Sequence, residues 1–271
     1  MSTDARPPYL MDLNRPVTRW LYDRGVLLNR SLREWNALHN AYAGQAGFVI
    51  GNGPSLQIED LERIKGLPSI GSNKLYLAYG ETGFRPTLLT AIDPIVTANV
   101  VDELRALPGK KYFSHRLAEI VEPMPGAIYW VDQTGATNDA KVKRKFSFDA
   151  RRVVYAGHTV TFNNLQLAFH LGLKTVYLIG MDFRFVLPSQ SVDHSYNTAL
   201  VSEGERNHFH PDYRKPGEIW TIPQLDHQKT AFESAKLHYE RHGRKIYNAS
   251  RETDLDVFER VDFDEVLSNW G

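Results

Sequence analysis

The residues best suited to chemistry in this chain are those of the turn 51–55, which reads Gly-Asn-Gly-Pro-Ser. The turn follows the apolar run 47–50 and precedes the amphipathic segment 58–65, so we expect a strand, a tight turn and a helix. Backbone N–H groups and the positive end of the helix would then meet in one place, which suits a phosphate. Gly51 and Gly53 keep Cβ atoms out of a ligand's path, and the Asn52 amide can bind a sugar or base.

The same turn differs from the two best-known phosphate-binding motifs. It lacks the Gly-Lys-Ser/Thr of a P-loop, and it does not spell Gly-x-Gly-x-x-Gly. A plain strand–helix connection without a ligand would use the same residues, so the turn by itself leaves both interpretations open.

Two histidines lie in the segment 184–222, which is polar, aromatic and irregular. A long irregular stretch in a compact domain is usually an active-site lid or a disordered segment, and its aromatic residues argue against disorder. His208 and His210 are candidate general bases because the pKa of histidine lies near neutrality. They could instead hold the lid together or, as His-x-His, bind a metal, and the sequence leaves these roles open.

The elements that would position these residues alternate between strands and helices. We predict strands over 47–50, 69–73, 87–92, 110–113, 127–131, 175–179 and 245–247, and helices over 58–65, 100–107, 159–171 and 224–242. This alternation predicts an α/β fold of the Rossmann-like kind, a mainly parallel sheet with helices on both faces. Ligands bind outside the carboxyl ends of such strands. The polar residues that follow a predicted strand are Asn52, Asn73, Asp93, Asp182 and Asn248.

The domain organisation that we predict has two parts. An N-terminal helical extension covers 1–45, and a nucleotide-binding domain covers 46–271 with its lid at about 184–222. Apolar residues recur on one helical face between 16 and 43, where Gly25 allows a break into two helices. Such helices would pack on the main domain or on another subunit of a homo-oligomer. The mixture of Arg and Trp also fits peripheral docking on a membrane surface, such as the inner membrane.

Composition and charge exclude several classes of protein. The chain has 32 basic and 32 acidic residues, so no global field favours nucleic acid as a partner. Cysteine is absent, which excludes disulfides, thiolate metal sites and a Cys nucleophile. The N-terminus lacks the apolar core of a signal peptide, and no run reaches the roughly 18 apolar residues of a membrane span. We therefore expect a cytoplasmic protein.

Three parts of the sequence resemble the sialyltransferases of glycosyltransferase family 42: 51–56, then 72–76 with Asp93-Pro94, and the helix–strand block 159–183. The chain is even more similar to a broad bacterial domain family that is also labelled 6-hydroxymethylpterin diphosphokinase-like, and flagellin-modifying proteins carry a related domain. The segments 207–213 and 243–248 are similar to signatures of that family. The resemblance covers about residues 46–250.

The resemblance implies an enzyme that transfers a sugar with inversion and without a metal or cofactor. The donor would be a CMP-activated nonulosonic acid, sialic acid-like or Kdo-like, and the acceptor a glycan or glycoprotein in surface glycan or flagellin modification. By position, Asn52 and Ser55 would lie by the phosphate and ribose, beside Gly51 and Gly53. Asn73 would also contact the donor, and Asp182 would bind the cytidine or ribose. Thr159 and Thr161 begin the helix whose counterpart in the family contacts the donor carboxylate. A lid histidine, His208 or His210, would be the base.

Two positions depart from the family 42 pattern. Asp93 stands where that family has Asn, and Arg184 stands where it has a Tyr that assists the leaving phosphate. An arginine still neutralises a phosphate with a permanent charge. We therefore expect the backbone N–H groups at 53–55, together with Arg184 or Tyr196, to meet the charge of the leaving group.

Two other functions fit the same elements. A Mg²⁺-dependent pterin diphosphokinase acting with ATP would need clustered carboxylates near the phosphates, and only Asp93 and Asp182 are well placed. A non-catalytic nucleotide-sugar-binding scaffold would need no base, so the two lid histidines argue against it.

Overall fold

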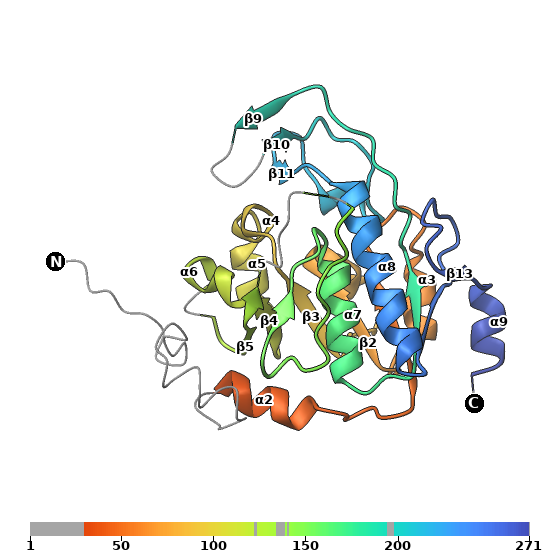
Figure 1. Cartoon of the computed structure of the whole chain (residues 1–271). Coiled ribbons are helices and arrows are strands. Elements are labelled where there is room, and N and C mark those ends of the chain that lie inside the picture. The colour runs from red at the N-terminus through yellow and green to blue at the C-terminus, as the bar shows by residue number, and fades with distance from the viewer. Residues whose placement is uncertain (1–29, 122–123, 134–138, 140, 194–197, 271) are drawn as a thin grey trace.

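The computed structural model describes residues 30–121, 124–133, 139, 141–193 and 198–270 (Figure 1). Most of the predicted N-terminal extension, 1–29, lies outside the described residues, and so does Tyr196. The bounds of the extension and of the main domain therefore stay a prediction. Among the helices of the described ranges, none is both long enough and apolar enough to cross a membrane.

A central sheet of eight strands organises the fold, in the order β13-β12-β8-β1-β2-β3-β4-β5, and all its pairings are parallel. The strands are β1 (Ala46–Ile50), β2 (Ser69–Ser72), β3 (Leu88–Ala91), β4 (Lys111–Ser114), β5 (Ala127–Trp130), β8 (Thr175–Ile179), β12 (Lys245–Asn248) and β13 (Glu259–Arg260). The predicted mainly parallel sheet is confirmed. Strands β2 to β5 extend from β1 in one direction and β8, β12 and β13 in the other. The strand order therefore reverses between β1 and β8, which is where such sheets bind ligands.

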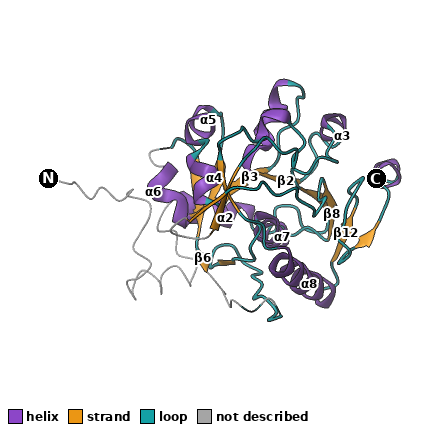
Figure 2. Cartoon of the chain, turned by 90° about the horizontal axis from the view of Figure 1, so that it is seen from above, coloured by secondary structure: helices purple, strands orange, loops and turns teal. Residues whose placement is uncertain are grey.

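Helices cover both faces of this sheet (Figure 2). One face carries α2 (Arg30–Leu38), α7 (Val160–His170) and α8 (Leu225–Arg241), and the other carries α3 (Ile58–Arg63), α5 (Val101–Ala106), α6 (Ala118–Val121) and α9 (Phe263–Ser268). Successive residues of β1 point to opposite faces, so Val49 joins one hydrophobic core while Phe48 and Ile50 join the other. Burial on both faces explains why β1 reads as a continuous apolar run.

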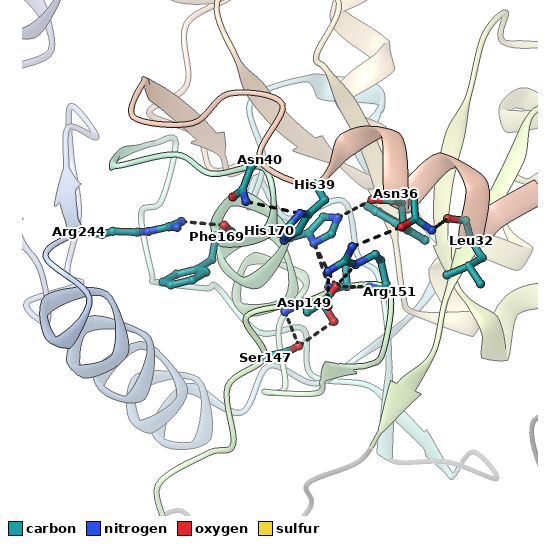
Figure 3. A network of polar contacts seen from close by, with 12 residues as sticks. Leu32, Asn36, His39, Asn40, Ser147, Asp149, Arg151, Phe169, His170 and Arg244 are labelled. Atoms are coloured by element: carbon teal, nitrogen blue, oxygen red, sulfur yellow. Dashed lines mark hydrogen bonds and ion pairs between the residues drawn. The ribbon is translucent and has the colours of Figure 1, made fainter. Parts of the chain in front are cut away.

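Helix α2 lies in the described part of the predicted extension, 30–45, and polar contacts join this part to the main domain (Figure 3). The fully buried His170, at the end of α7, has its Nε2 atom 2.9 Å from the carbonyl oxygen of Trp35. Its Nδ1 atom lies 3.5 Å from the carboxylate of Asp149, which also pairs with Arg151. The Trp35 indole donates to the carbonyl oxygen of Tyr129 in β5. This part of the extension therefore packs on the main domain.

The lid segment contains a second sheet that the sequence did not predict. Strands β9 (Ser191–Asp193), β10 (Thr198–Val201) and β11 (Ile219–Thr221) pair antiparallel in the order β11-β10-β9. Figure 1 shows this sheet above the helix α4 (Pro94–Ala98), which β11 contacts. The expectation of irregular backbone over 184–222 was wrong here, because strands of three or four residues are too short for a clear alternation. A small parallel pair, β6 (Asp132–Gln133) and β7 (Val154–Tyr155), was also not predicted.

Candidate functional site

A cavity of about 140 Å³ lies at the carboxyl ends of β1 and β8, where the strand order reverses. We call it the switch-point cavity. Nine of the predicted site residues line it: Gly51, Asn52, Gly53, Asn73, Thr159, Thr161, Asp182, Arg184 and His208. They come from the ends of β1, β2 and β8, from the start of α7 and from the lid. These nine residues, which are far apart in the sequence, therefore lie together at one edge of the sheet, as predicted.

The glycine-rich turn is joined tightly to the end of β8. The N–H of Gly51 donates to the carbonyl of Ile179 at 2.8 Å, and the N–H of Gly53 donates to the carbonyl of Gly180 at 2.9 Å. A Cβ on Gly51 would collide with the Gly180 carbonyl, and one on Gly53 would collide with the Asp182 carboxylate. The glycines thus allow two strand ends to approach closely. The expectation that these N–H groups are free for a phosphate was wrong, because β8 lies next to β1 and accepts them.

Asp182 holds this turn in place. Its carboxylate accepts a hydrogen bond from the Ser55 N–H at 3.0 Å and another from the Ser55 hydroxyl at 2.5 Å. Burial raises the pKa of Asp182, and the two hydrogen bonds from Ser55 act against that rise. Ser55 does not line the switch-point cavity, and its side chain hydrogen-bonds to Asp182 there instead of facing a ligand.

Asn52 combines an anchored amide with an unpartnered oxygen. Its Nδ2 atom donates to the carbonyl of Ser72 at 3.2 Å and to the Ser72 hydroxyl at 3.3 Å. Its Oδ1 atom is buried and has no hydrogen-bond partner. Because buried polar atoms in native proteins are almost always paired, this oxygen in a cavity wall is a candidate acceptor for a ligand donor.

The N-terminus of α7 also faces the switch-point cavity. Thr159 caps the helix with its hydroxyl, which accepts from the N–H of Thr161, and the Thr161 hydroxyl donates to the sulfur of Met181. Both hydroxyls therefore have protein partners. The helix end itself supplies partial positive charge, which favours a phosphate or carboxylate at this place.

Unusual backbone conformations gather around this cavity. Asn73 (φ 52°) and Phe183 (φ 58°) line it, and His158 (φ 61°) directly precedes Thr159. Positive φ is strained for residues with a Cβ and concentrates at functional sites.

His208 lies flat against Tyr213, with ring centroids 3.8 Å apart and 6° between the planes. Its Nδ1 atom is buried without a hydrogen-bond partner. Burial and the nearby Arg214 and Lys74 cations hold the pKa of His208 well below its usual range, so the imidazole is neutral at neutral pH. A neutral imidazole with an unpaired nitrogen can accept a proton or a hydrogen bond from a ligand.

Three residues around His208, namely Tyr213, Lys74 and Arg214, were not among the predicted site residues. Tyr213 hydrogen-bonds with the side chain of Asn73, and burial raises the pKa of its phenol to about 12. Lys74 is buried and pairs with Glu218 at 2.9 Å, which connects the end of β2 to the lid. The sequence indicated Tyr213 only as one of the aromatic residues that argue against disorder, and no signal there showed that it stacks on His208.

Other predicted residues lie outside the switch-point cavity. His210 accepts at Nδ1 from the N–H of Asp212, and its Nε2 atom is 3.7 Å from Glu81. Asp93 caps α4 by accepting from the N–H groups of Ile95 and Val96, and its second oxygen accepts from Thr221 at 2.7 Å. Through these contacts, His210 and Asp93 stabilise turns and helix ends at the lid.

Two further polar residues have partners of their own. Arg184, at the switch-point cavity, forms ion pairs with Glu252 and Asp254. The buried Asn248 donates to Thr253 and to the carbonyl of Leu255, which stabilises the turn after β12. Within the described ranges, no group of three or more His, Asp or Glu side chains is arranged to hold a metal ion.

The family model described as 6-hydroxymethylpterin diphosphokinase MptE-like matches residues 27–187, more than half of the chain. The chain belongs to this family. The resemblance seen in the sequence is thereby confirmed. The match includes β1 to β8 and α7, and it ends just inside the lid. No curated protein sequence matches the chain.

Solved structures of similar fold include glycosyltransferases. The MAf glycosyltransferase from Magnetospirillum magneticum AMB-1 is 15% identical, with a TM-score of 0.49 over 90% of this chain and 39% of that chain. The sialyltransferase CstII from Campylobacter jejuni, in complex with cytidine-5'-monophosphate, is 12% identical, with a TM-score of 0.43 over 81% of this chain and 85% of that chain. The chain thus spans about two fifths of the MAf structure.

Proposed function

We propose that this protein is a metal-independent, inverting glycosyltransferase that uses a CMP-activated nonulosonic acid as its donor. The observation that carries the proposal is the position of His208. Its neutral imidazole, with an unpartnered Nδ1, lines a cavity at the switch point of a parallel sheet, beside the N-terminus of α7. A general base has to be unprotonated and within reach of the acceptor hydroxyl, and His208 meets the first requirement.

The reaction would be a single displacement. The acceptor hydroxyl oxygen forms a bond to the anomeric carbon of the donor sugar while the bond from that carbon to the phosphate oxygen breaks. His208 takes the hydroxyl proton, and CMP leaves with the bonding electron pair. The positive end of α7 would stabilise the phosphate or the donor carboxylate, and Arg184 would meet the leaving-group charge by exchanging one of its present acidic partners.

The low pKa of His208 is a property of the protein without ligand. Burial disfavours the charged imidazolium most, and the nearby Arg214 and Lys74 cations disfavour it further. The donor brings a phosphate and a carboxylate, and negative charge at this place would raise the pKa of His208 toward the range of an effective base. Donor binding would in this way prepare the base that the reaction needs.

The lid would move when the donor binds. A volume of about 140 Å³ is small against the roughly 300–1,000 Å³ of typical ligand sites. Only a few described contacts connect the lid to the strand ends, among them the Phe209 N–H to the Asn52 carbonyl and the Lys74–Glu218 pair. Exchanging these contacts would open room for a nucleotide.

Family membership favours one second candidate, a pterin diphosphokinase. That reaction uses ATP with Mg²⁺ held by carboxylates. Of the two carboxylates placed by the sequence, Asp93 is engaged in capping α4 and Asp182 is bound to Ser55. Both would have to exchange these partners to hold a metal ion.

Calorimetry with CMP, CDP, UDP, GDP and ATP, first with EDTA and then with Mg²⁺, separates these functions. Binding of CMP in EDTA supports the glycosyltransferase, and binding of ATP only with Mg²⁺ overturns it in favour of the diphosphokinase.

Catalysis itself is tested with a matched pair of variants. His208→Ala should lose about 10²–10⁴-fold in turnover of a CMP-nonulosonate while keeping its CMP affinity, as expected for a lost general base. His242→Ala, at an exposed histidine that follows α8 and lines neither this cavity nor its neighbour, is the control and should retain turnover. A His208→Ala protein with wild-type turnover would reject His208 as the base, and a wild type inactive with every donor would favour the binding scaffold.

A further inference from the structure

A second and larger cavity, of about 530 Å³, lies beside the switch-point cavity. We call it the lid cavity, because Pro54 and the lid residues between 204 and 216 line it. His208 and Tyr213 line both cavities, so this stacked pair is the wall that they share. The glycine-rich turn also lies between the two cavities, because Gly53 lines the switch-point cavity and Pro54 lines the lid cavity.

We propose that the lid cavity is the acceptor site and that it takes a sugar residue bearing a carboxylate or a phosphate, at the end of a glycan. This inference rests on the proposed function. In an inverting displacement the acceptor oxygen attacks from the side opposite the leaving group, and the base has to touch that oxygen. If the nucleotide occupies the switch-point cavity, a base in the shared wall can serve an acceptor in the neighbouring cavity.

The lining of the lid cavity suits a sugar ring. Phe209, Tyr213, Pro211 and Pro216 offer flat apolar surfaces against which the C–H faces of a sugar can pack. A volume of about 530 Å³ falls within the range of small-molecule sites and admits one or two sugar residues, not a folded protein.

The charges of the lining favour an anion. Arg206 and Arg214 line the lid cavity together with one carboxylate, that of Glu205. The guanidinium of Arg214 lies 4.0 Å from the ring centre of Trp220, and its Nε atom is buried without a partner. A guanidinium held in this way keeps donors ready for a carboxylate or phosphate, which it binds through two parallel hydrogen bonds. Arg206 is exposed at the same cavity and can complete the site.

The test uses glucuronic acid as the anionic probe and methyl glucoside as the neutral one, titrated into the full chain saturated with CMP. We expect glucuronic acid to bind at least about tenfold more tightly, as one charged hydrogen-bonded contact provides. Arg206→Ala should remove most of this preference, and Arg206→Lys should keep part of it. Arg152→Ala, an exposed arginine outside both cavities, is the matched control and should change nothing.

The CMP titration of each variant separates the two proposals. Unchanged CMP affinity with a lost preference for glucuronic acid in Arg206→Ala supports the acceptor site. Normal CMP binding with equal affinity for both sugars, or an effect of Arg152→Ala as large as that of Arg206→Ala, overturns the acceptor site and leaves the glycosyltransferase standing. Absence of CMP binding in the wild type overturns the proposed function, and the acceptor role falls with it.

Discussion

The imidazole of His208 lies parallel to the phenol ring of Tyr213, with their centroids 3.8 Å apart. The Tyr213 hydroxyl in turn hydrogen-bonds with the backbone of Lys74 and with the side chain of Asn73, which follows β2 in a strained backbone conformation. This chain of contacts connects a strand end of the main sheet to the candidate base in the lid. Tyr213 is therefore a positioning residue for His208.

Tyr213→Leu should lower kcat for a CMP-nonulosonate by about a hundredfold, because loss of the stacked ring lets the base leave its productive position. Tyr213→Phe keeps the ring and loses only the hydrogen bonds of the hydroxyl to the Lys74 backbone and the Asn73 side chain, so we expect a smaller fall. The KM for the donor should change little in either variant. Equal losses in the two variants would show that the hydroxyl, not the stacking, matters, and a rise in KM alone would point to a binding role.

The pH profile of kcat/KM should have its acidic limb well below pH 6.5. A general base works only when it is neutral, and the pKa of His208 in the free protein is lowered by burial and by the Arg214 and Lys74 cations. Activity should therefore stay on its plateau at pH 6.5 and fall only at lower pH. An acidic limb centred at or above pH 6.5 contradicts this assignment.

Lys74→Gln should raise the pKa of His208, since it removes one of the two cations that disfavour the imidazolium. NMR titration of the His208 ring would measure the shift directly, and the acidic limb of the activity profile should move upward with it. Lys65→Gln is a suitable control, because this exposed lysine pairs with Glu62 outside both cavities. A His208 pKa that is the same in all three proteins rejects the role given to Lys74.

Gly53→Ala should destabilise the fold by about 1–3 kcal/mol, as overpacking of a well-packed site does, because the new Cβ collides with the Asp182 carboxylate. Gly80→Ala is the matched control, since a Cβ there meets no atom within 4 Å. Urea unfolding of both variants measures the difference. If Gly53→Ala is as stable as the wild type, the close approach of the two strand ends is not what requires the glycine.

Asp149→Asn should lower stability at neutral pH by about 1–3 kcal/mol, the cost of disrupting charged hydrogen bonds. Burial alone would raise the pKa of Asp149, but hydrogen bonds from His170 and Arg151 outweigh it and hold the pKa well below its usual range. A carboxylate with a depressed pKa stabilises the fold above its unfolded pKa of about 3.9, and that contribution disappears as the pH falls further. The difference between variant and wild type should therefore shrink below about pH 4. Asp102→Asn, on an exposed i,i+3 pair, should show no such dependence.

The sequence by itself determined the sheet and the edge at which the site lies. The run 47–50 is buried on both faces and is apolar throughout, which makes it easy to recognise. The run 175–179 is partly exposed at Thr175 and Tyr177 but consists of residues that favour strands. Once the strands were known to be parallel, Asn52, Asn73 and Asp182 had to approach one another, because parallel strands end at the same edge. These conclusions depend on local composition and on a general rule of topology.

Only the tertiary structure decided what these residues contact. Ser55 bonds to Asp182 across 127 positions of sequence. The N–H groups of Gly51 and Gly53 donate to Ile179 at the end of β8 and to Gly180 directly after it, because β8 is one of the two strands that pair with β1. Asp93 acts as a helix cap since Pro94 begins a helix there. The pairing of His208 with Tyr213, and the two cavities that they separate, follow from how the lid folds back on the sheet. Such contacts join side chains that are far apart in the sequence, so the spacing of residues along the chain does not predict them.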